Sequence, residues 1–249
     1  MIVDAHQHFW DPARAQYPWM TDELNRRYGP EHIDPILREY GVAGTIIVQA
    51  RHSLDETREL LAIAQTTPFV LGVVGWLDLT GDVDRQLGEL DSPLVGVRHQ
   101  VHDELDAKWL LRVDVQRGLA AVGAAGMAYD LLVRTRELPA AVETVRRHPE
   151  VKFVLDHVAK RPPDDGAWSE GVTALAAFPN VACKVSGLLS EHDPAGTARL
   201  ALDWFGADRC MFGSDWPVNS DYGAALAIAG DDPDVLARTA VRTYGLEIG

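Results

Sequence analysis

Short apolar runs recur eight times along the 249-residue chain, and they constrain its fold more than any other feature. Each run is rich in Val, Ile, Leu and Phe, and a polar cluster and a stretch with helical spacing follow it. This order is typical of repeated βα units. The predicted strands are Ile2–Ala5, Gly44–Gln49, Val70–Leu77, Leu94–Arg98, Met127–Val133, Lys152–Asp156, Val181–Ser186 and Cys210–Ser214.

The segments between these runs are predicted to be helices. Apolar residues in Leu54–Gln65 recur about every 3.6 positions, Ser53 or Asp55 can cap that helix, and Leu138–Arg147 has the same pattern. Buried strands that alternate with helices form a parallel sheet, and eight of them can close into a barrel of about 250 residues. We therefore predict an α/β fold, a (β/α)8 TIM barrel that need not be regular, as a single domain over residues 1–249.

An open, doubly wound sheet is the competing architecture. The glycine-rich turn that binds dinucleotides does not follow the first strand, and the sequence contains no G-x-x-x-x-G-K-[ST] phosphate-binding loop. Dinucleotide-dependent and P-loop chemistry are therefore disfavoured.

Composition narrows the range of partners. Lys and Arg number 23 against 37 Asp and Glu, for a formal net charge of −14, which repels nucleic acid and anionic membranes. No run approaches 18 apolar residues, and no export leader precedes the first strand. The two cysteines, Cys183 and Cys210, lie in apolar runs and are expected to be buried thiols in a reducing compartment. We expect a cytoplasmic protein that acts on a small molecule.

Polar residues end several of the predicted strands. In a parallel barrel the side chains that carry out chemistry come from the carboxyl ends of the strands, so these residues are expected to converge. They occur in His6-Gln7-His8, Arg98-His99-Gln100-Val101-His102, Asp156-His157, Lys184-Val185-Ser186 and Asp215-Trp216.

His6 and His8 are two residues apart, so in an extended chain both imidazoles point to the same side. This arrangement suits either a metal ion or a clamp on the substrate, and His157 and Asp215 at later strand ends strengthen that interpretation. Asp215 is the best candidate for a general base, because an apolar strand leads directly into it. The alternative is that Asp215 only caps the following turn.

Other residues at the strand ends are candidates for substrate binding. Arg98 can donate several hydrogen bonds to a carbonyl or carboxylate of the substrate, and Lys184 can place a positive charge beside it. The alternative is that each forms an ion pair with Asp130 or Asp156. The tryptophans that come just after three of the predicted strands can line a pocket or pack in the core. The full candidate set is Arg98, His99, His102, Lys184, Trp10, Trp76 and Trp216. The remaining histidines His32, His52, His148 and His192 are interpreted as surface or packing residues.

The ordered motifs along the chain resemble the amidohydrolase superfamily, and more narrowly its branch of sugar-lactone and dicarboxylate-lactone hydrolases. The resemblance spans essentially the whole sequence. It rests on Asp4-Ala5-His6-Gln7-His8-Phe9-Trp10-Asp11-Pro12, Gly96-Val97-Arg98-His99, Leu155-Asp156-His157 with Lys160, Lys184-Val185-Ser186-Gly187-Leu188, and Phe212-Gly213-Ser214-Asp215-Trp216-Pro217.

This resemblance implies a barrel that hydrolyses a small lactone, most simply a sugar-derived aldonolactone. It places His6, His8, His157 and Asp215 at the family's metal or substrate-carbonyl positions. Two mechanisms are open. In the first, a divalent ion, with Zn²⁺ the best candidate, activates water and polarises the carbonyl. In the second, no metal takes part: Asp215 accepts a proton from water, while the histidines and Arg98 stabilise the oxyanion.

A site with two bridged metal ions is not expected. The fourth predicted strand has no lysine to bridge them, and the fifth ends in Tyr129-Asp130-Leu131 without a histidine. A metal-dependent decarboxylase of the same superfamily and a barrel that binds a sugar acid without turning it over are the alternative functions.

Overall fold

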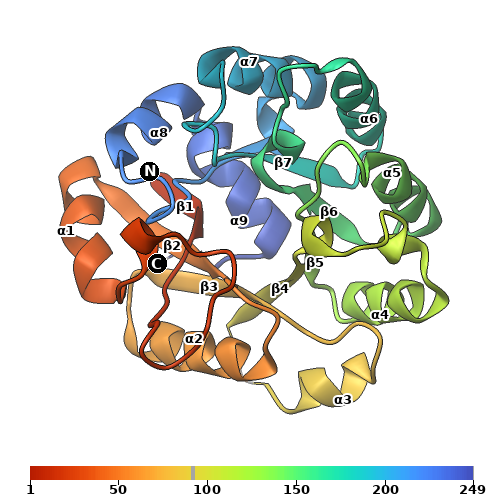
Figure 1. Ribbon diagram of the computed structural model, residues 1–249. Helices are drawn as coiled ribbons and strands as arrows, with labels where there is room; N and C mark the ends of the chain where they lie inside the picture. Colours follow the sequence, from red (N-terminus) through yellow and green to blue (C-terminus); the bar gives the residue numbers. More distant parts are fainter. Residues whose placement is uncertain (91–92, 249) are drawn as a thin grey trace.

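A computed structural model describes residues 1–90 and 93–248, so residues 91, 92 and 249 of the predicted domain lie outside the described residues. Its strands form one parallel sheet in which each strand pairs with the next along the chain (Figure 1). The strands are β1 (Ile2–Gln7), β2 (Val42–Val48), β3 (Val70–Gly75), β4 (Leu94–His99), β5 (Ala128–Leu131), β6 (Lys152–Leu155), β7 (Val181–Val185) and β8 (Cys210–Phe212). All eight predicted strands are confirmed, with ends that coincide or differ by at most two residues.

Helices surround this ring of strands, as Figure 1 shows. They are α1 (Pro30–Tyr40), α2 (Leu54–Thr66), α3 (Val83–Gly88), α4 (Val113–Ala124), α5 (Leu138–Arg147), α6 (Gly166–Ala176), α7 (Pro194–Phe205) and α8 (Tyr222–Ala229). A further helix, α9 (Thr239–Tyr244), lies inside this circle of helices in Figure 1. The helix predicted from residue 54 begins there, and the Ser53 side chain caps it by accepting a hydrogen bond from the Glu56 N–H.

The ring closes where β1 meets the segment after β8. The His8 N–H donates to the Trp216 carbonyl, and the Asp215 N–H donates to the His6 carbonyl, both at 2.8 Å. The two ends of the chain are thereby joined at the carboxyl ends of their strands. The predicted (β/α)8 TIM barrel is confirmed.

A register shift in β1 decides which way its histidines point. Val3 and Ala5 belong to the cluster of apolar side chains inside the barrel, so strict alternation would also place Gln7 inside. The shift between Asp4 and Gln7 instead pairs Gln7 with Ile47, which packs in the layer between strands and helices. His6 and His8 are thereby turned toward the barrel mouth.

The barrel interior is packed with small and branched side chains from the strands, among them Ile46, Val74 and Met211. Ala240 and Tyr244 of α9 belong to the same cluster, so this last helix packs against the inner layer of the barrel. A larger cluster lies between the strands and the surrounding helices.

Cys183 and Cys210 are buried free thiols, as predicted. Within residues 1–90 and 93–248, no helix is both long enough and apolar enough to cross a membrane.

Candidate active site

Four of the predicted residues meet at the mouth of the barrel. Asp215 Oδ1 lies 3.4 Å from His8 Nε2, 3.7 Å from His6 Nε2 and 4.0 Å from His157 Nε2. The Nε2 atoms of His6 and His8 are 3.2 Å apart. Residues from both ends of the sequence and from the sixth βα unit therefore surround one point, as the strand-end argument predicts.

The other ring nitrogen of each histidine faces a second group. His8 Nδ1 lies 2.7 Å from the Val48 carbonyl, and His157 Nδ1 lies 2.9 Å from Ser186 Oγ. His6 Nδ1 faces Asp156 Oδ1 at 3.5 Å. The carbonyl of Val48 can only accept, so His8 carries its proton on Nδ1 and presents the Nε2 lone pair to the site.

Unusual backbone conformations position two of these side chains. His157, Val158, Ala159 and Lys160 all have φ between 48° and 57°, and φ of Asp215 is 58°. Residues with a Cβ rarely adopt this left-handed region, and such strain concentrates at functional sites. The turn after β6 brings both His157 and Lys160 to the barrel mouth.

Burial sets the protonation of the site. It lowers the pKa of His6 well below its ordinary value, with the Lys184 charge acting in the same direction. Burial also lowers the pKa of His157 to about 4, against the opposing effect of Asp215. Burial alone would raise the pKa of Asp215, but His157, His8 and His6 hold it well below its usual range. Neutral imidazoles therefore face an ionised carboxylate, and these are the forms that bind a metal.

The donor set fits one divalent ion. His6, His157 and Asp215 offer ligand atoms within 4.8 Å of one another, and the His8 Nε2 joins them. Four ligands about 2.0–2.1 Å from a tetrahedral Zn²⁺ are about 3.3 Å apart, close to the 3.2–4.0 Å separations found here. Imidazole and carboxylate are ligands that Zn²⁺ prefers. His6 Nε2 also lies 3.3 Å from Arg98 Nη1, a contact that an ion on His6 would replace.

A buried ionic network lies beside the site. Asp156 accepts a hydrogen bond from Arg98 Nη1 at 2.9 Å and lies 3.1 Å from Lys184 Nζ, which also pairs with Asp130. Lys184 is fully buried, so its predicted role as a substrate contact on the rim is wrong. Its two carboxylate partners offset the desolvation of its charge, and this is the ion-pair alternative considered from the sequence.

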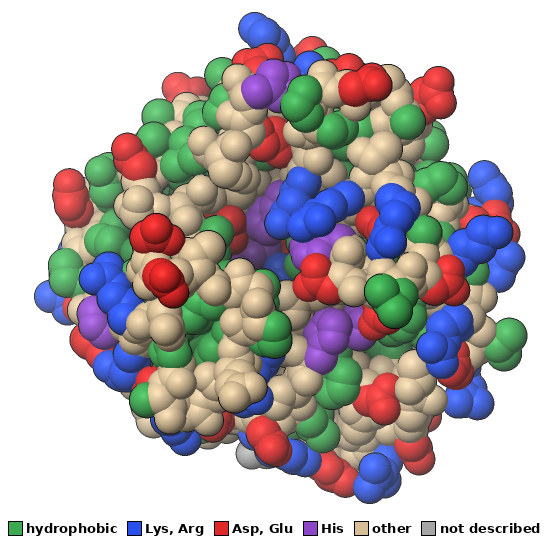
Figure 2. Space-filling view, viewed as in Figure 1, with side chains coloured by type: hydrophobic (Ala, Val, Ile, Leu, Met, Phe, Trp, Pro, Cys, Tyr) green, Lys and Arg blue, Asp and Glu red, His purple; other side chains and the backbone are tan. Residues whose placement is uncertain are grey.

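A cavity of about 240 Å³ opens onto the four converging residues. Figure 2 shows it as a hollow in which histidine side chains lie next to lysine and arginine side chains. Its walls come from His8, Trp19, Ala50, Arg98, Gln100, His102, Asp103, Leu132, Arg134, His157, Lys160, Asp215 and Val218. The predicted contacts Arg98 and His102 are among them.

The other predicted substrate contacts lie elsewhere. His99 is stacked between the rings of His52 and Trp109, and its Nδ1 accepts a hydrogen bond from Trp76 Nε1. His99, Trp76, Trp10 and Trp216 are absent from the cavity wall formed by the described residues. Each is engaged in packing or hydrogen bonds, and the structure does not place them at this cavity, so their role as substrate contacts stays a prediction.

Trp10 and Trp216 are engaged in hydrogen bonds and packing, the alternative to substrate contact that the sequence left open. Trp10 Nε1 donates to the carbonyls of Leu24 and Arg26, and the Trp216 ring packs edge-to-face against Tyr28. The aromatic wall of the cavity is instead Trp19, whose indole N–H donates to the Ala50 carbonyl at 2.7 Å. Trp19 lies in the long loop after β1, and no strand-end rule indicates it.

His52, His99 and Glu104 form a second group of potential ligands. Three of their four ring nitrogens have partners: His99 Nδ1 accepts from Trp76, His99 Nε2 lies 2.7 Å from Glu104, and His52 Nε2 accepts from the Gln100 N–H. This group is a hydrogen-bond network, and it contributes packing next to the site.

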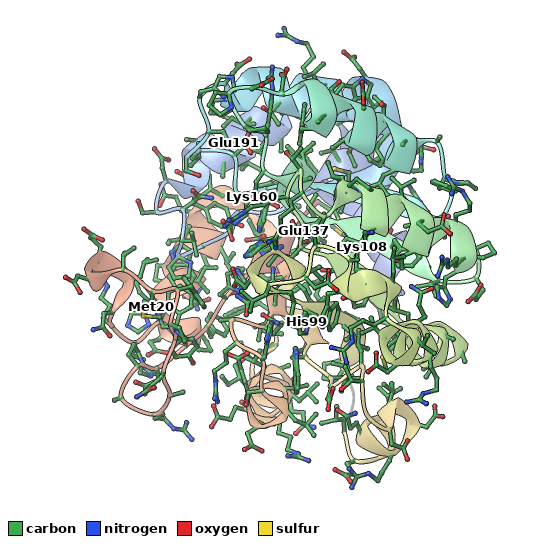
Figure 3. All side chains as sticks on the ribbon, turned by 45° about the vertical axis from the view of Figure 1, so that its right-hand side comes forward. Met20, His99, Lys108, Glu137, Lys160 and Glu191 are labelled. Carbon is green, nitrogen blue, oxygen red and sulfur yellow. The ribbon has the colours of Figure 1, made fainter. Side chains whose placement is uncertain are left out.

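Two cations in the cavity wall are absent from the predicted candidate set. Lys160 belongs to the motif after the sixth strand but had no assigned role, and Arg134 follows β5. Their position after the strand ends was the signal that could have identified them. Figure 3 labels Lys160, which lies near the centre of the molecule.

The protein is a (β/α)8 barrel with a polar site at its strand ends, and comparison with known proteins specifies the family. The chain matches the amidohydrolase family over residues 3–246, and it belongs to that family. It is 39% identical over 247 residues to an L-fucono-1,5-lactonase of Burkholderia ambifaria, covering 90% of this chain and 85% of that protein. An L-fucono-1,5-lactonase of Burkholderia multivorans is 38% identical over 242 residues, covering 87% and 82% of the two chains.

A solved amidohydrolase of Burkholderia multivorans with bound Zn has the same fold. Its TM-score is 0.93 at 33% identity, and the match covers 99% of this chain and all of that one.

Proposed function

We propose that this protein hydrolyses a small sugar-derived lactone, an aldonolactone or a close analogue, to the open hydroxy acid. The observation that carries the proposal is the convergence of His6, His8, His157 and Asp215 on one point of a small polar cavity. The relatives named L-fucono-1,5-lactonase support the substrate class.

In the proposed reaction, water attacks the lactone carbonyl while Asp215 accepts a proton from it. The carbonyl oxygen gains negative charge, and Arg98 at the cavity wall is placed to stabilise it. The ring C–O bond then breaks, and the leaving alkoxide takes up the proton that water released. One water is consumed, and the product is a hydroxy acid, which ionises to the carboxylate and releases one proton to the solvent.

We also propose that His6, His8, His157 and Asp215 hold one Zn²⁺ ion. When bound, the ion supplies a Lewis acid for the carbonyl and lowers the pKa of water. The bound Zn in the Burkholderia multivorans amidohydrolase supports this assignment.

The decisive experiment is a panel of aldonolactones assayed by acid release. We expect Asp215→Asn to lower kcat/KM by at least about 100-fold, the lower end for loss of a general base. Asp203→Asn, which removes an exposed carboxylate on α7, is the matched control and should retain full activity. If no lactone is opened faster than in buffer, and Asp215→Asn changes nothing, the lactonase proposal fails.

Metal analysis of the same preparations tests the ion. We expect about one Zn²⁺ per chain in the wild type, loss of activity on chelation, and much less bound Zn²⁺ in His157→Ala. Full activity in a metal-free sample would contradict the metal proposal and favour the mechanism in which Asp215 acts without an ion. Release of carbon dioxide from an aromatic or unsaturated acid would favour the decarboxylase alternative.

A further inference from the structure

Two cations in the wall of the cavity have no carboxylate within ion-pair distance among the described residues. The side chains of Lys160 and Arg134 make no hydrogen bond or ion pair with any residue in 1–90 or 93–248. Lys160 is partly buried, and burial lowers its pKa while the charge of Asp215 opposes that shift from beyond ion-pair distance. An ammonium group in such a place is stabilised further by an anion in direct contact. An unpaired surface arginine is ordinary, but this one shares a 240 Å³ cavity with the partly buried lysine.

The carboxylates nearest these cations have other partners. Glu191, whose charge also interacts with Lys160, accepts a hydrogen bond from the Arg161 N–H. Asp156 pairs with Arg98 and Lys184, and Asp215 faces the three histidines. Asp103, the remaining acidic residue of the wall, lies 3.3 Å from His102 Nε2 and is about half exposed.

Lys160 and Arg134 also repel each other across the cavity. The Arg134 charge acts on Lys160, and both charges act on His102, which lies on the same wall. Two like charges directed into one cavity oppose folding, and an anionic ligand between them removes that penalty. A ligand that carries only hydroxyl groups does not.

We propose that Lys160 and Arg134 form an anion subsite and that the preferred substrate is a sugar lactone with a carboxylate away from its reacting carbonyl. This inference rests on the proposed lactonase function and narrows its substrate. The reacting carbonyl would lie at Asp215 and the histidines, and the carboxylate at the part of the wall that Lys160 and Arg134 form.

A matched pair of substrates tests the subsite. The 1,4-lactones of D-gluconic and D-glucaric acid differ only in a carboxylate that replaces the terminal hydroxymethyl group. Hydrogen bonds to charged groups contribute about 1.5–3 kcal/mol, so we expect kcat/KM to be at least about tenfold higher for the glucaric lactone. Lys160→Met and Arg134→Met should each reduce that ratio to near unity, mainly through KM for the glucaric lactone.

Lys152→Met is the matched control. Lys152 is an exposed lysine at the opposite end of β6, the strand that leads into the Lys160 turn, and its replacement should leave the ratio unchanged. High salt should also reduce the preference of the wild type, because salt screens the attraction of an exposed Arg134.

A binding experiment keeps this inference separate from the lactonase proposal. By calorimetry, wild-type protein should bind D-glucarate at least about tenfold more tightly than D-gluconate, and Lys160→Met should lose the difference. If both acids bind equally, or the neutral lactone is the better substrate, the anion subsite is wrong even though the lactonase proposal stands. If no lactone is opened but glucarate is still preferred, the lactonase proposal fails and the subsite remains.

Discussion

The histidines of this chain acquire different roles from their surroundings. His6 and His157 are buried among partners that leave Nε2 directed at Asp215, so burial favours the neutral form that can accept or ligate. His99 follows a strand in the same way, but its ring is stacked against Trp109 and its nitrogens have protein partners. The residue type at a strand end therefore indicates the region of the site, and neighbouring side chains decide whether it takes part.

Glu56 allows a prediction about pH and stability. Its carboxylate is 2% exposed, and burial raises its pKa to about 7, against hydrogen bonds from the Arg51 and Ala50 N–H groups. Between pH 4.5, its ordinary pKa, and about 7, the folded protein keeps a proton that the unfolded chain has lost, so stability falls as pH rises.

We expect wild-type stability relative to Glu56→Gln to fall by up to about 3 kcal/mol across that window, measured by urea unfolding. Glu59→Gln, on the exposed side of α2, is the control and should show no such difference. A wild type and Glu56→Gln with parallel pH profiles would contradict the prediction.

At the scale of elements, two local irregularities build the site. The register shift in β1 directs His6 and His8 to the mouth, and the left-handed turn of residues 157–160 presents His157 and Lys160 there. Gly187, in the loop after β7, lies directly against this turn. A Cβ at Gly187 would come within 2.5 Å of His157 Nδ1, so the glycine makes room for the imidazole.

Gly187→Ala should therefore displace His157 and lower kcat/KM by at least about tenfold, since misplaced catalytic groups lose much of their effect. Gly126→Ala is a close control, because both glycines have a left-handed backbone, with φ +74° at Gly126 and +65° at Gly187. They differ in their surroundings, since nothing lies within 4 Å of a Cβ added at Gly126. Both variants should lose about 1–2 kcal/mol of stability from the left-handed backbone. Equal activity in the two variants would show that the contact with His157 is unimportant.

At the scale of the whole molecule, the barrel depends on contacts between the two ends of the sequence. Asp4 of β1 accepts hydrogen bonds from Ser214 after β8 and from the Tyr222 hydroxyl of α8. Tyr244 of α9 donates to Asp130, which pairs with Lys184 in the network beside the site. The last helix is thereby connected to the residues that hold His6.

Ala240 tests the packing of that helix. It is 1% exposed within the inner apolar cluster, so Ala240→Asp would bury an unpaired carboxylate there. We expect a loss of about 3 kcal/mol or more in the free energy of unfolding, measured by urea denaturation. Arg238→Asp, at an exposed position two residues earlier, should change stability by less than about 1 kcal/mol. Similar losses in both variants would contradict the role given to α9.

Periodicity and strand-end chemistry were enough to predict the eight strands, the parallel barrel and the three histidines that meet at Asp215. These features depend on local patterns and on one rule of barrel geometry. The substrate contacts were less predictable. Whether Lys184 reaches a ligand or pairs with Asp130, and whether Trp10 or Trp19 lines the cavity, depends on side chains that are distant in sequence. Burial and pairing are properties of the packed molecule, so only its three-dimensional arrangement could assign those roles.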